Sequence, residues 1–478
     1  MCTFRLFGCL LTLSVFGHAQ MVQSVAQPSG GTVQAANDDL LPLQAAVDRA
    51  VTNYATVRIA LERVLAARAQ IALTRTQFLP QATFLYQTNR STYNNIPGLL
   101  LPQGVIPPIT GTVLANTSGR SVWESAGGFF VNWEPTRFGY RRAEVAAAEA
   151  GGRAATNSLT LTKLDVANAA ASAYLAIASA HEQVKSAQAD LDRRMSFAKV
   201  IQVLVENQLR PGADASEADA EVAASRTRLI QAKTTEKVDT TGLGELLGLP
   251  SGQVVIDTDS LLAAPPLSNP ASATLPHPLV LEQRNLLEQT KAQERVWSRA
   301  YAPRFTVEGV IAGRGSGVQP DGTLAGGATG LGPNRENWAV GVQATFAPLD
   351  YFSIREEKKI AAANERAQQL NLQNTVVTLN AQEEQARAQL DGAMQIARNT
   401  PIQLNAAKTG ESQARARYEA GLANIVEATQ AQALLQQAEA QDALAHLGVW
   451  QALLGVSVAQ GDIAPFLNQL PNPTAGGH

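Results

Sequence analysis

The chain has 478 residues, of which 5% are aromatic and 17% charged, and its formal net charge is -3. Its length would suffice for two or three compact domains, but so few aromatic and charged residues favour an elongated, helix-rich protein instead. The slightly acidic balance provides no basic surface for nucleic acid and argues against nucleic-acid binding.

The N-terminal segment has the order of a secretory signal peptide. Arg5 precedes an apolar run from Leu6 to Phe16, and small residues suitable for cleavage end at Ala19. We therefore expect a signal peptide over 1–19; cleavage after Ala26 and, less favoured, lipidation at Cys9 are the alternatives. Both cysteines lie in this leader, which excludes disulfide, metal-thiolate and cysteine-nucleophile chemistry from the mature chain.

A tail over 20–41 leads into the first helical pattern, from Pro42 to Phe78. Two strands are expected next, at about 81–91 and 121–134, separated by a loop rich in proline, glycine and asparagine. Along each strand, apolar residues alternate with polar or small ones, so each has one apolar face. These apolar positions are Ala82, Phe84 and Tyr86 in the first strand, and Phe129, Val131 and Trp133 in the second.

A very long helix is predicted after the second strand. It begins near Gly139 and ends near Arg210, about 70 residues or on the order of 100 Å, which exceeds what a globular core needs. The chain reverses at Pro211-Gly212, where we expect Gly212 to adopt the left-handed conformation, and returns as a helix to about Leu249. The segment 42–249 is thus a helix, two strands and a helical hairpin.

The same order repeats after a linker over 250–276 that is rich in proline, serine and alanine. The second unit covers 277–457, with strands at about 304–312 and 337–347, a possible kink at Pro401 and a turn near Gly421. Pro348 ends the last strand as Pro135 ends its counterpart, 213 residues earlier. The tail over 458–478 is expected to be disordered.

The strands indicate how the chain meets a membrane. No run of about 20 apolar residues follows the leader, so we expect no transmembrane helix. Four strands of about ten residues could cross a bilayer, but they cannot close a barrel, and open sheet edges are excluded from lipid. Three copies would supply twelve strands and bundle their helices into a tube. The predicted fold class is therefore mixed: a trimeric twelve-stranded membrane β-barrel, four strands per subunit, continuous with a coiled-coil α-helical barrel.

Three tryptophans are candidates for the aromatic girdle of such a barrel: Trp123, Trp133 and Trp338. The alternative is that these rings fill an ordinary β-sheet core. The girdle is the preferred interpretation, because no other part of the chain is left to cover the sheet.

The repeated unit resembles the outer membrane efflux protein family, whose familiar member is TolC. The residues that carry the resemblance are Pro135 and Pro348, the segment Tyr418 to Leu422 with Glu427, and the weaker motif Leu209 to Gly212. The resemblance covers nearly the whole mature chain. It implies a homotrimeric, passive conduit in the outer membrane with a periplasmic extension, joined through a periplasmic adaptor to an inner-membrane pump, for efflux or type I secretion.

The resemblance also implies roles for residues near the two helical turns. Glu427 matches a family position whose carboxylates line the periplasmic aperture, and the second such position falls on Gln430. Tyr418 matches a tyrosine that latches the closed tip, but its family partners fall on Ala423 and Ala218, the latter flanked by Glu217 and Asp219. Gly212, Gly421 and Leu422 match the tips that contact the adaptor.

Simpler structural explanations exist for several of these residues. Asn424 and Glu427 have the spacing of a helix capping box, the two glycines suit tight turns, and Tyr418 could serve only to pack. No catalytic, metal-binding or cofactor motif is evident, so we predict no enzyme and no cofactor. The alternatives in other classes are a trimeric coiled-coil surface adhesin or structural envelope protein, and a soluble periplasmic scaffold. The transported substrate is not legible from the sequence.

Overall fold

The computed structural model describes residues 40–92, 119–249, 254–262, 276–319 and 323–470. Contacts within the chain separate Met1–Leu40 from Leu41–His478, and every element below belongs to the second unit. The predicted signal peptide, nearly all of the loop between the first two strands and most of the linker lie outside the described residues.

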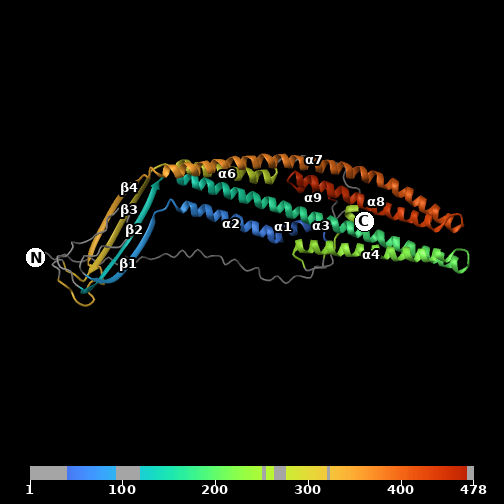
Figure 1. The fold of residues 1–478 in the computed structure, drawn as a ribbon, viewed down its shortest axis with the longest axis horizontal. Helices are drawn as coiled ribbons and strands as arrows, with labels where there is room; N and C mark the ends of the chain where they lie inside the picture. Colours follow the sequence, from blue (N-terminus) through green and yellow to red (C-terminus); the bar gives the residue numbers. More distant parts are fainter. Residues whose placement is uncertain (1–39, 93–118, 250–253, 263–275, 320–322, 471–478) are drawn as a thin grey trace, which may run out of the picture. The chain divides into compact units, whose positions relative to one another are not determined.

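Four strands form one antiparallel sheet in the order β1-β2-β3-β4 (Figure 1). Their bounds are Gln81–Thr92, Ser121–Thr136, Arg304–Ser316 and Arg335–Thr345. β3 ends four residues beyond the expected 312, and it pairs as far as Glu124↔Ser316. β1 and β4 are the edge strands of this sheet.

The register places the four apolar strand faces on one side of the sheet. Phe84 is opposite Phe129, Phe129 opposite Ile311, and Ile311 opposite Trp338. Directly opposed residues share a face, and these four side chains are 72%, 49%, 71% and 77% exposed. The other face buries Phe130 and Val310, so the sheet presents a continuous apolar band outward.

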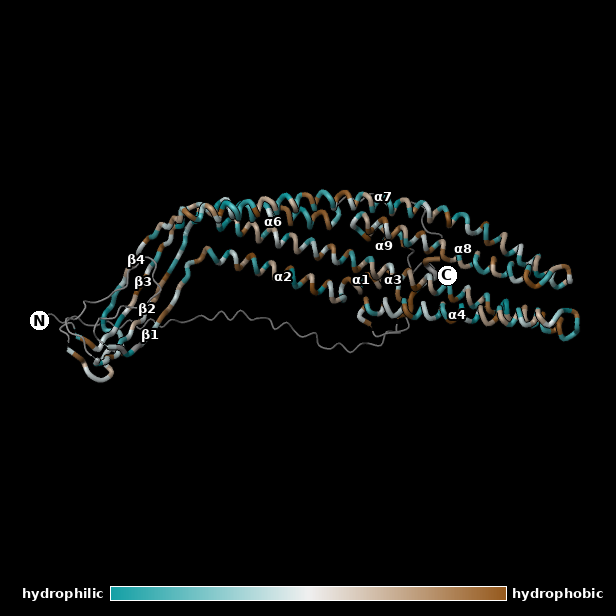
Figure 2. Tube along the Cα trace, viewed as in Figure 1, coloured by the Kyte–Doolittle hydropathy of each residue, from teal (hydrophilic) through white to brown (hydrophobic). Residues whose placement is uncertain are grey.

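The helices form two long hairpins with shorter helices packed against them (Figures 1 and 2). α3 packs against α4 and α6, and α7 packs against α8 and α6. The bounds are α1 Leu43–Asn53, α2 Ala55–Thr76, α3 Tyr140–Glu206, α4 Gly212–Leu247, α5 Asp259–Leu262, α6 Pro278–Arg299, α7 Asp350–Glu419, α8 Ile425–Ala459 and α9 Ala464–Leu467.

Three local expectations need correction. The first helical pattern is interrupted at Tyr54, whose extended backbone lets α1 turn its own apolar face onto α3. α7 continues through Pro401 without a break. Gly212 is the first residue of α4, and the left-handed conformation of that turn belongs to Gln208, with φ of 61°. Pro211 immediately before Gly212 fixes an extended entry into α4, so Gly212 needs no positive φ.

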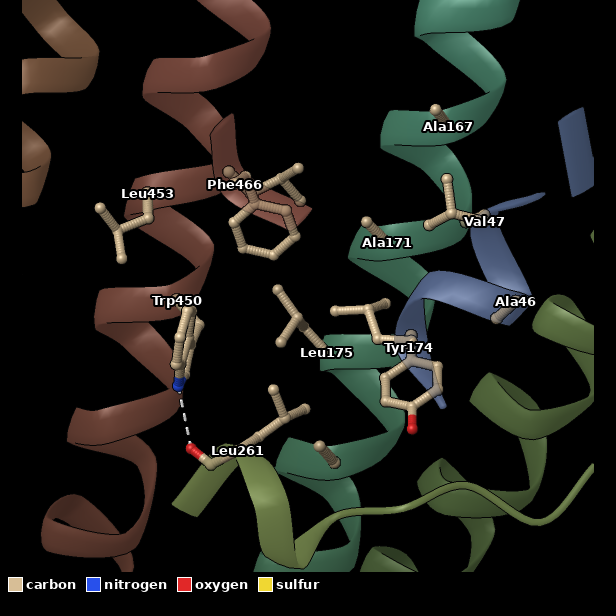
Figure 3. Packing of buried hydrophobic residues seen from close by; sticks show 14 of the residues in the cluster. Ala46, Val47, Ala167, Ala171, Tyr174, Leu175, Leu261, Trp450, Leu453 and Phe466 are labelled. Carbon is tan, nitrogen blue, oxygen red and sulfur yellow. Dashed lines mark hydrogen bonds between the residues drawn. The ribbon is translucent and has the colours of Figure 1, made fainter. Parts of the chain in front are cut away.

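The main core lies where α3 and α8 meet α1, α5 and α9 (Figure 3). Trp450 donates its indole N–H to the Leu261 carbonyl at 3.0 Å, and Phe466 contacts the Trp450 ring edge-on. Leu261 belongs to the predicted linker and Phe466 to the tail that was expected to be disordered. Both are 1% exposed, so up to Leu470 the disorder prediction was wrong, because Phe466 fills a space in this core.

The prediction that no helix could span a membrane was too strict. Within the described part of the chain, α8 is long and apolar enough to do so by length and composition alone. Its apolar composition is explained by burial, since Leu447, Trp450 and Leu453 belong to the main core. Helices at the centre of a folded domain have the same composition.

His277 gives the core a pH dependence. Its Nδ1 accepts the Leu279 N–H at 3.1 Å and caps α6, and a Cβ added to Gly461 would lie 2.8 Å from its ring. Burial lowers the pKa of His277, although the Val458 backbone and Asp165 oppose this.

A histidine whose folded pKa is lowered binds fewer protons than in the unfolded chain, so stability falls as pH decreases through the unfolded value near 6.5. We expect the melting temperature to drop between pH 7.5 and 5.5, and His277→Asn, which can still cap the helix, to reduce this drop. Equal pH dependence of wild type and His277→Asn would contradict the assignment.

Candidate functional site

The candidate site consists of the two turns that end the helical hairpins. In the turn between α7 and α8, Gly421 has φ of 77° and the Leu422 N–H bonds the Arg417 carbonyl at 2.9 Å. In the turn between α3 and α4, the Leu209 N–H bonds the Leu204 carbonyl at 2.8 Å. Both are Schellman-type endings, in which a left-handed residue lets the next N–H satisfy a free carbonyl of the last helical turn.

Tyr418 joins the two turns. Its side chain is fully buried, and its hydroxyl donates to Asp214 Oδ2 of α4 at 3.0 Å. Arg210, from the first turn, lies over the ring at 4.4 Å and donates to the backbone carbonyls of Tyr418 and Ala423. Phe197 of α3 contacts the Tyr418 ring edge-on, with ring centres 5.3 Å apart. We call Arg210, Asp214 and Tyr418 the latch.

The electrostatics of the latch favour the hydrogen bond from Tyr418 to Asp214. Burial raises the pKa of Tyr418 to about 12, and the hydrogen bond to Asp214 acts in the same direction. The phenol therefore stays protonated near neutral pH and can only donate to the Asp214 carboxylate. Hydrogen bonds with one charged partner are the stronger kind, so the latch can hold the two hairpins together.

The structure separates the residues that the sequence singled out. Glu427 and Gln430 are exposed on α8, as are Gly212, Gly421 and Leu422 at the turns. Asn424 caps α8 by accepting the Glu427 N–H at 2.9 Å, and Glu427 itself is exposed. Asp219 is exposed and Glu217 half-buried, and neither bonds Tyr418. Ala218 and Ala423 are buried in the same cluster as Tyr418.

Sequence reasoning missed two of the three latch residues. Arg210 lies inside the Leu209 to Gly212 motif, which served as a turn signal and as a weak sign of the family resemblance, with no role assigned to the arginine. Asp214 is the acidic residue in the first turn of α4. An acidic side chain in that position is usually explained by the helix dipole alone, so nothing in the pattern distinguished it as a partner for Tyr418.

Ion pairs connect the helices between the latch and the main core. Arg193 of α3 forms two hydrogen bonds with Glu439 of α8, at 3.1 and 2.7 Å. Asp190 of α3 accepts from Arg194, Ser225 and Arg228, the last two on α4. The first hairpin is therefore held by a buried ionic cluster, and the salt bridge between Arg193 and Glu439 ties it to the second.

The three tryptophans of the predicted girdle lie at different levels of the sheet. Trp123 is half-exposed with Arg90 over its ring at 5.5 Å. Trp133 lies ten residues along the same strand, about 33 Å at strand spacing, and bonds the Phe78 carbonyl at 3.0 Å. Trp338 lies between these levels, in the row with Phe129. The three rings therefore do not lie in one row, and the aromatic girdle stays a prediction.

The combination of long helical hairpins with a sheet that has one apolar face defines a membrane-anchored helical channel protein. The family model described as outer membrane efflux protein matches residues 36–249 and 270–462. The chain belongs to the outer membrane efflux protein family, and it is an outer-membrane channel component.

Solved structures share this fold at low sequence identity. A membrane protein from Pseudomonas aeruginosa is 20% identical, with 88% of this chain and 90% of that chain covered and a TM-score of 0.72. The Campylobacter jejuni CmeC outer membrane channel is 16% identical, with 88% and 85% covered and a TM-score of 0.70. The open state of the Neisseria gonorrhoeae MtrE outer membrane channel is 18% identical, with 88% and 89% covered and a TM-score of 0.66.

A comparison with curated proteins found no match. Neither the family model nor the solved structures support the alternative of a surface adhesin, and the family consists of channels rather than enzymes.

Proposed function

We propose that three copies of the chain assemble into a passive conduit through the outer membrane, with twelve strands in lipid and the helical hairpins in the periplasm. The observation that carries this proposal is the sheet: an outward apolar band with open edges at β1 and β4. Because unpaired strand edges are not tolerated in a bilayer, neighbouring copies must pair β1 with β4.

The helices support the same assembly. On α7, Ile360, Leu370 and Val377 lie on the heptad pattern and are 56%, 63% and 66% exposed. Apolar residues at heptad positions normally pack against another helix. A neighbouring copy would cover this row.

The assembly predicts two measurements. The protein should run as a heat-resistant trimer from the outer-membrane fraction, and the purified trimer should give single-channel conductance in planar bilayers. A monomer, or a trimer without conductance, would contradict the proposal.

We further propose that the hairpin turns form the periplasmic gate and the contact with a periplasmic adaptor, through which an inner-membrane pump supplies the energy. Gly421 and Leu422 are exposed at the turn, next to the buried latch. A partner that binds these two residues and shifts the turn would therefore also move Tyr418. Crosslinking in cells followed by purification should recover an adaptor, and a disrupted second turn (Gly421→Asp with Leu422→Asp) should abolish its recovery. If this variant recovered as much adaptor as the wild type, the second turn would not be the contact with the adaptor.

Glu427 provides a test of the aperture. Three exposed carboxylates brought together at a threefold axis would raise the local negative potential and favour cations. We expect Glu427→Gln to shift the reversal potential in a salt gradient towards lower cation preference. The control is Glu384→Gln, the same charge change at an exposed position of α7 remote from the turns. An unchanged preference in Glu427→Gln would show that its carboxylate lies away from the aperture.

A further inference from the structure

Large apolar side chains are exposed where the sheet joins the helices. Leu79 follows α2, Phe138 precedes α3, and Phe346, Leu349, Tyr351 and Phe352 lie between β4 and the first turn of α7. They are 49–79% exposed. We call these six residues the junction collar. Exposed apolar clusters of this kind mark a contact with a partner or a membrane.

The collar continues the apolar face of the sheet. Phe346 keeps the alternation of Trp338, Val340 and Val342 along β4, so it points to the same side. Phe138 contacts Phe305, which lies on that face of β3, with ring centres 5.9 Å apart. The collar is therefore the helix-side border of the apolar band.

Basic residues are concentrated at this border. The segments 75–80, 134–142, 299–304 and 346–359 hold nine arginines and lysines against four acidic residues, although the whole chain has a net charge of -3. Five of the nine form ion pairs with glutamates, Arg355 with Glu356 at 4.0 Å among them. Arg142 and Arg299 are exposed and form no ion pair within the described part of the chain. Arg299 lies beside Gly139, next to Phe138. Arg355 is one turn beyond Phe352 on α7, hence on the same helix face.

Exposed aromatic residues interleaved with arginine suit the interface of a bilayer, where the rings enter the headgroup region and the cations meet phosphate. The excess positive charge selects among phospholipids. We propose that the junction collar and its arginines bind the headgroups of anionic phospholipids in the membrane leaflet nearer the helices. This inference rests on the proposed placement of the sheet in the bilayer.

The test uses the full-length trimer reconstituted in phosphatidylcholine, with spin-labelled phosphatidylglycerol or phosphatidylcholine as the probe. Electron paramagnetic resonance measures the lipid immobilised by the protein. We expect phosphatidylglycerol to associate about fivefold more strongly, the effect of roughly one basic residue at a charged membrane surface. High salt should remove most of this preference, which checks the wild type without any substitution.

The variant Arg142→Gln/Arg299→Gln/Arg355→Gln should bind both lipids equally. Its matched control is Arg226→Gln/Lys233→Gln/Arg398→Gln, with the same charge change at exposed positions away from the collar, which should keep the preference. The inference would be overturned if the wild type showed no preference for phosphatidylglycerol. It would also be overturned if the first variant kept a preference for phosphatidylglycerol that high salt did not remove. Either result would indicate that another protein surface covers the collar. If the sheet were not in the bilayer, neither lipid would be immobilised, which separates failure of the proposed function from failure of this inference.

Discussion

Replacing Tyr418 with phenylalanine should raise the mean conductance of the reconstituted channel at least about tenfold, the effect of one hydrogen bond, because it removes from each subunit the hydroxyl that donates to Asp214. A hydrogen bond to a charged group contributes about 1.5–3 kcal/mol, and 1.4 kcal/mol corresponds to a tenfold change in an equilibrium. The lower end applies, since Asp214 is half-buried and regains water when the hydroxyl is lost. The phenyl ring keeps its contacts with Phe197 and Arg210, so packing changes little.

Two further variants make this result specific. Arg210→Gln removes the stacking on the ring and should also raise conductance. Tyr54→Phe is the matched control: this half-buried tyrosine hydroxyl makes no hydrogen bond within the described residues and lies outside the turns. Single-channel recordings of the three variants, each checked as an intact trimer, decide the matter. Wild-type conductance in Tyr418→Phe would show that the latch is a packing feature rather than a gate.

The strands of the sheet were predictable because the alternation of apolar and polar residues can be read within each strand alone. A strand with one face in an apolar medium alternates strictly, and this pattern is readable in β4 from Trp338 to Phe346. What the pattern lacks is the register between strands. Pairing of Phe84, Phe129, Ile311 and Trp338 in one row depends on contacts between segments as far apart in the chain as Phe129 and Ile311, which periodicity does not encode.

Features set by tertiary packing were missed for the same reason. The short apolar stretch around Phe466 resembles a tail, and only the space beside Trp450 gives it a structured role. Tyr54 breaks a pattern that continues on both sides of it, because α1 must leave the line of α2 to reach the main core. Helix periodicity identifies the apolar face but not where the partner surface ends.

The site was predictable in position but not in chemistry. Turn signals located both hairpin ends, and the family resemblance drew attention to Tyr418. The partners expected by resemblance had become alanines, while the residues that bond Tyr418 are offset from them, at Arg210 and Asp214. A hydrogen bond between residues 204 positions apart depends on how two hairpins approach each other, and no sequence motif of either hairpin contains that information.

The buried ionic cluster between α3 and α4 is where a single substitution in the first hairpin should cost most stability, because removing one partner leaves a buried charge unpaired. Asp190 and Arg194 are 2% and 4% exposed at their side chains, and Asp190 also accepts from Ser225. Asp190→Asn leaves the Arg194 charge buried with Glu221 as its remaining carboxylate partner. Breaking a buried pair on one side typically costs 3–5 kcal/mol, so we expect a loss of about 3 kcal/mol, measured as urea unfolding followed by circular dichroism.

Two controls separate the cost of leaving Arg194 buried without Asp190 from the net stabilisation that the Asp190–Arg194 ion pair provides. Asp192→Asn makes the same change two residues away at an exposed position and should alter stability by less than about 0.5 kcal/mol. Asp190→Leu combined with Arg194→Leu and Ser225→Ala removes both buried charges and the buried hydroxyl that donates to Asp190, while Glu221 and Arg228 stay 40% exposed and reach water. We expect this triple variant to be about as stable as the wild type, because apolar packing replaces a costly desolvated pair. If it were as unstable as Asp190→Asn, the cluster would contribute net attraction, and its loss rather than an orphaned arginine would explain the single variant.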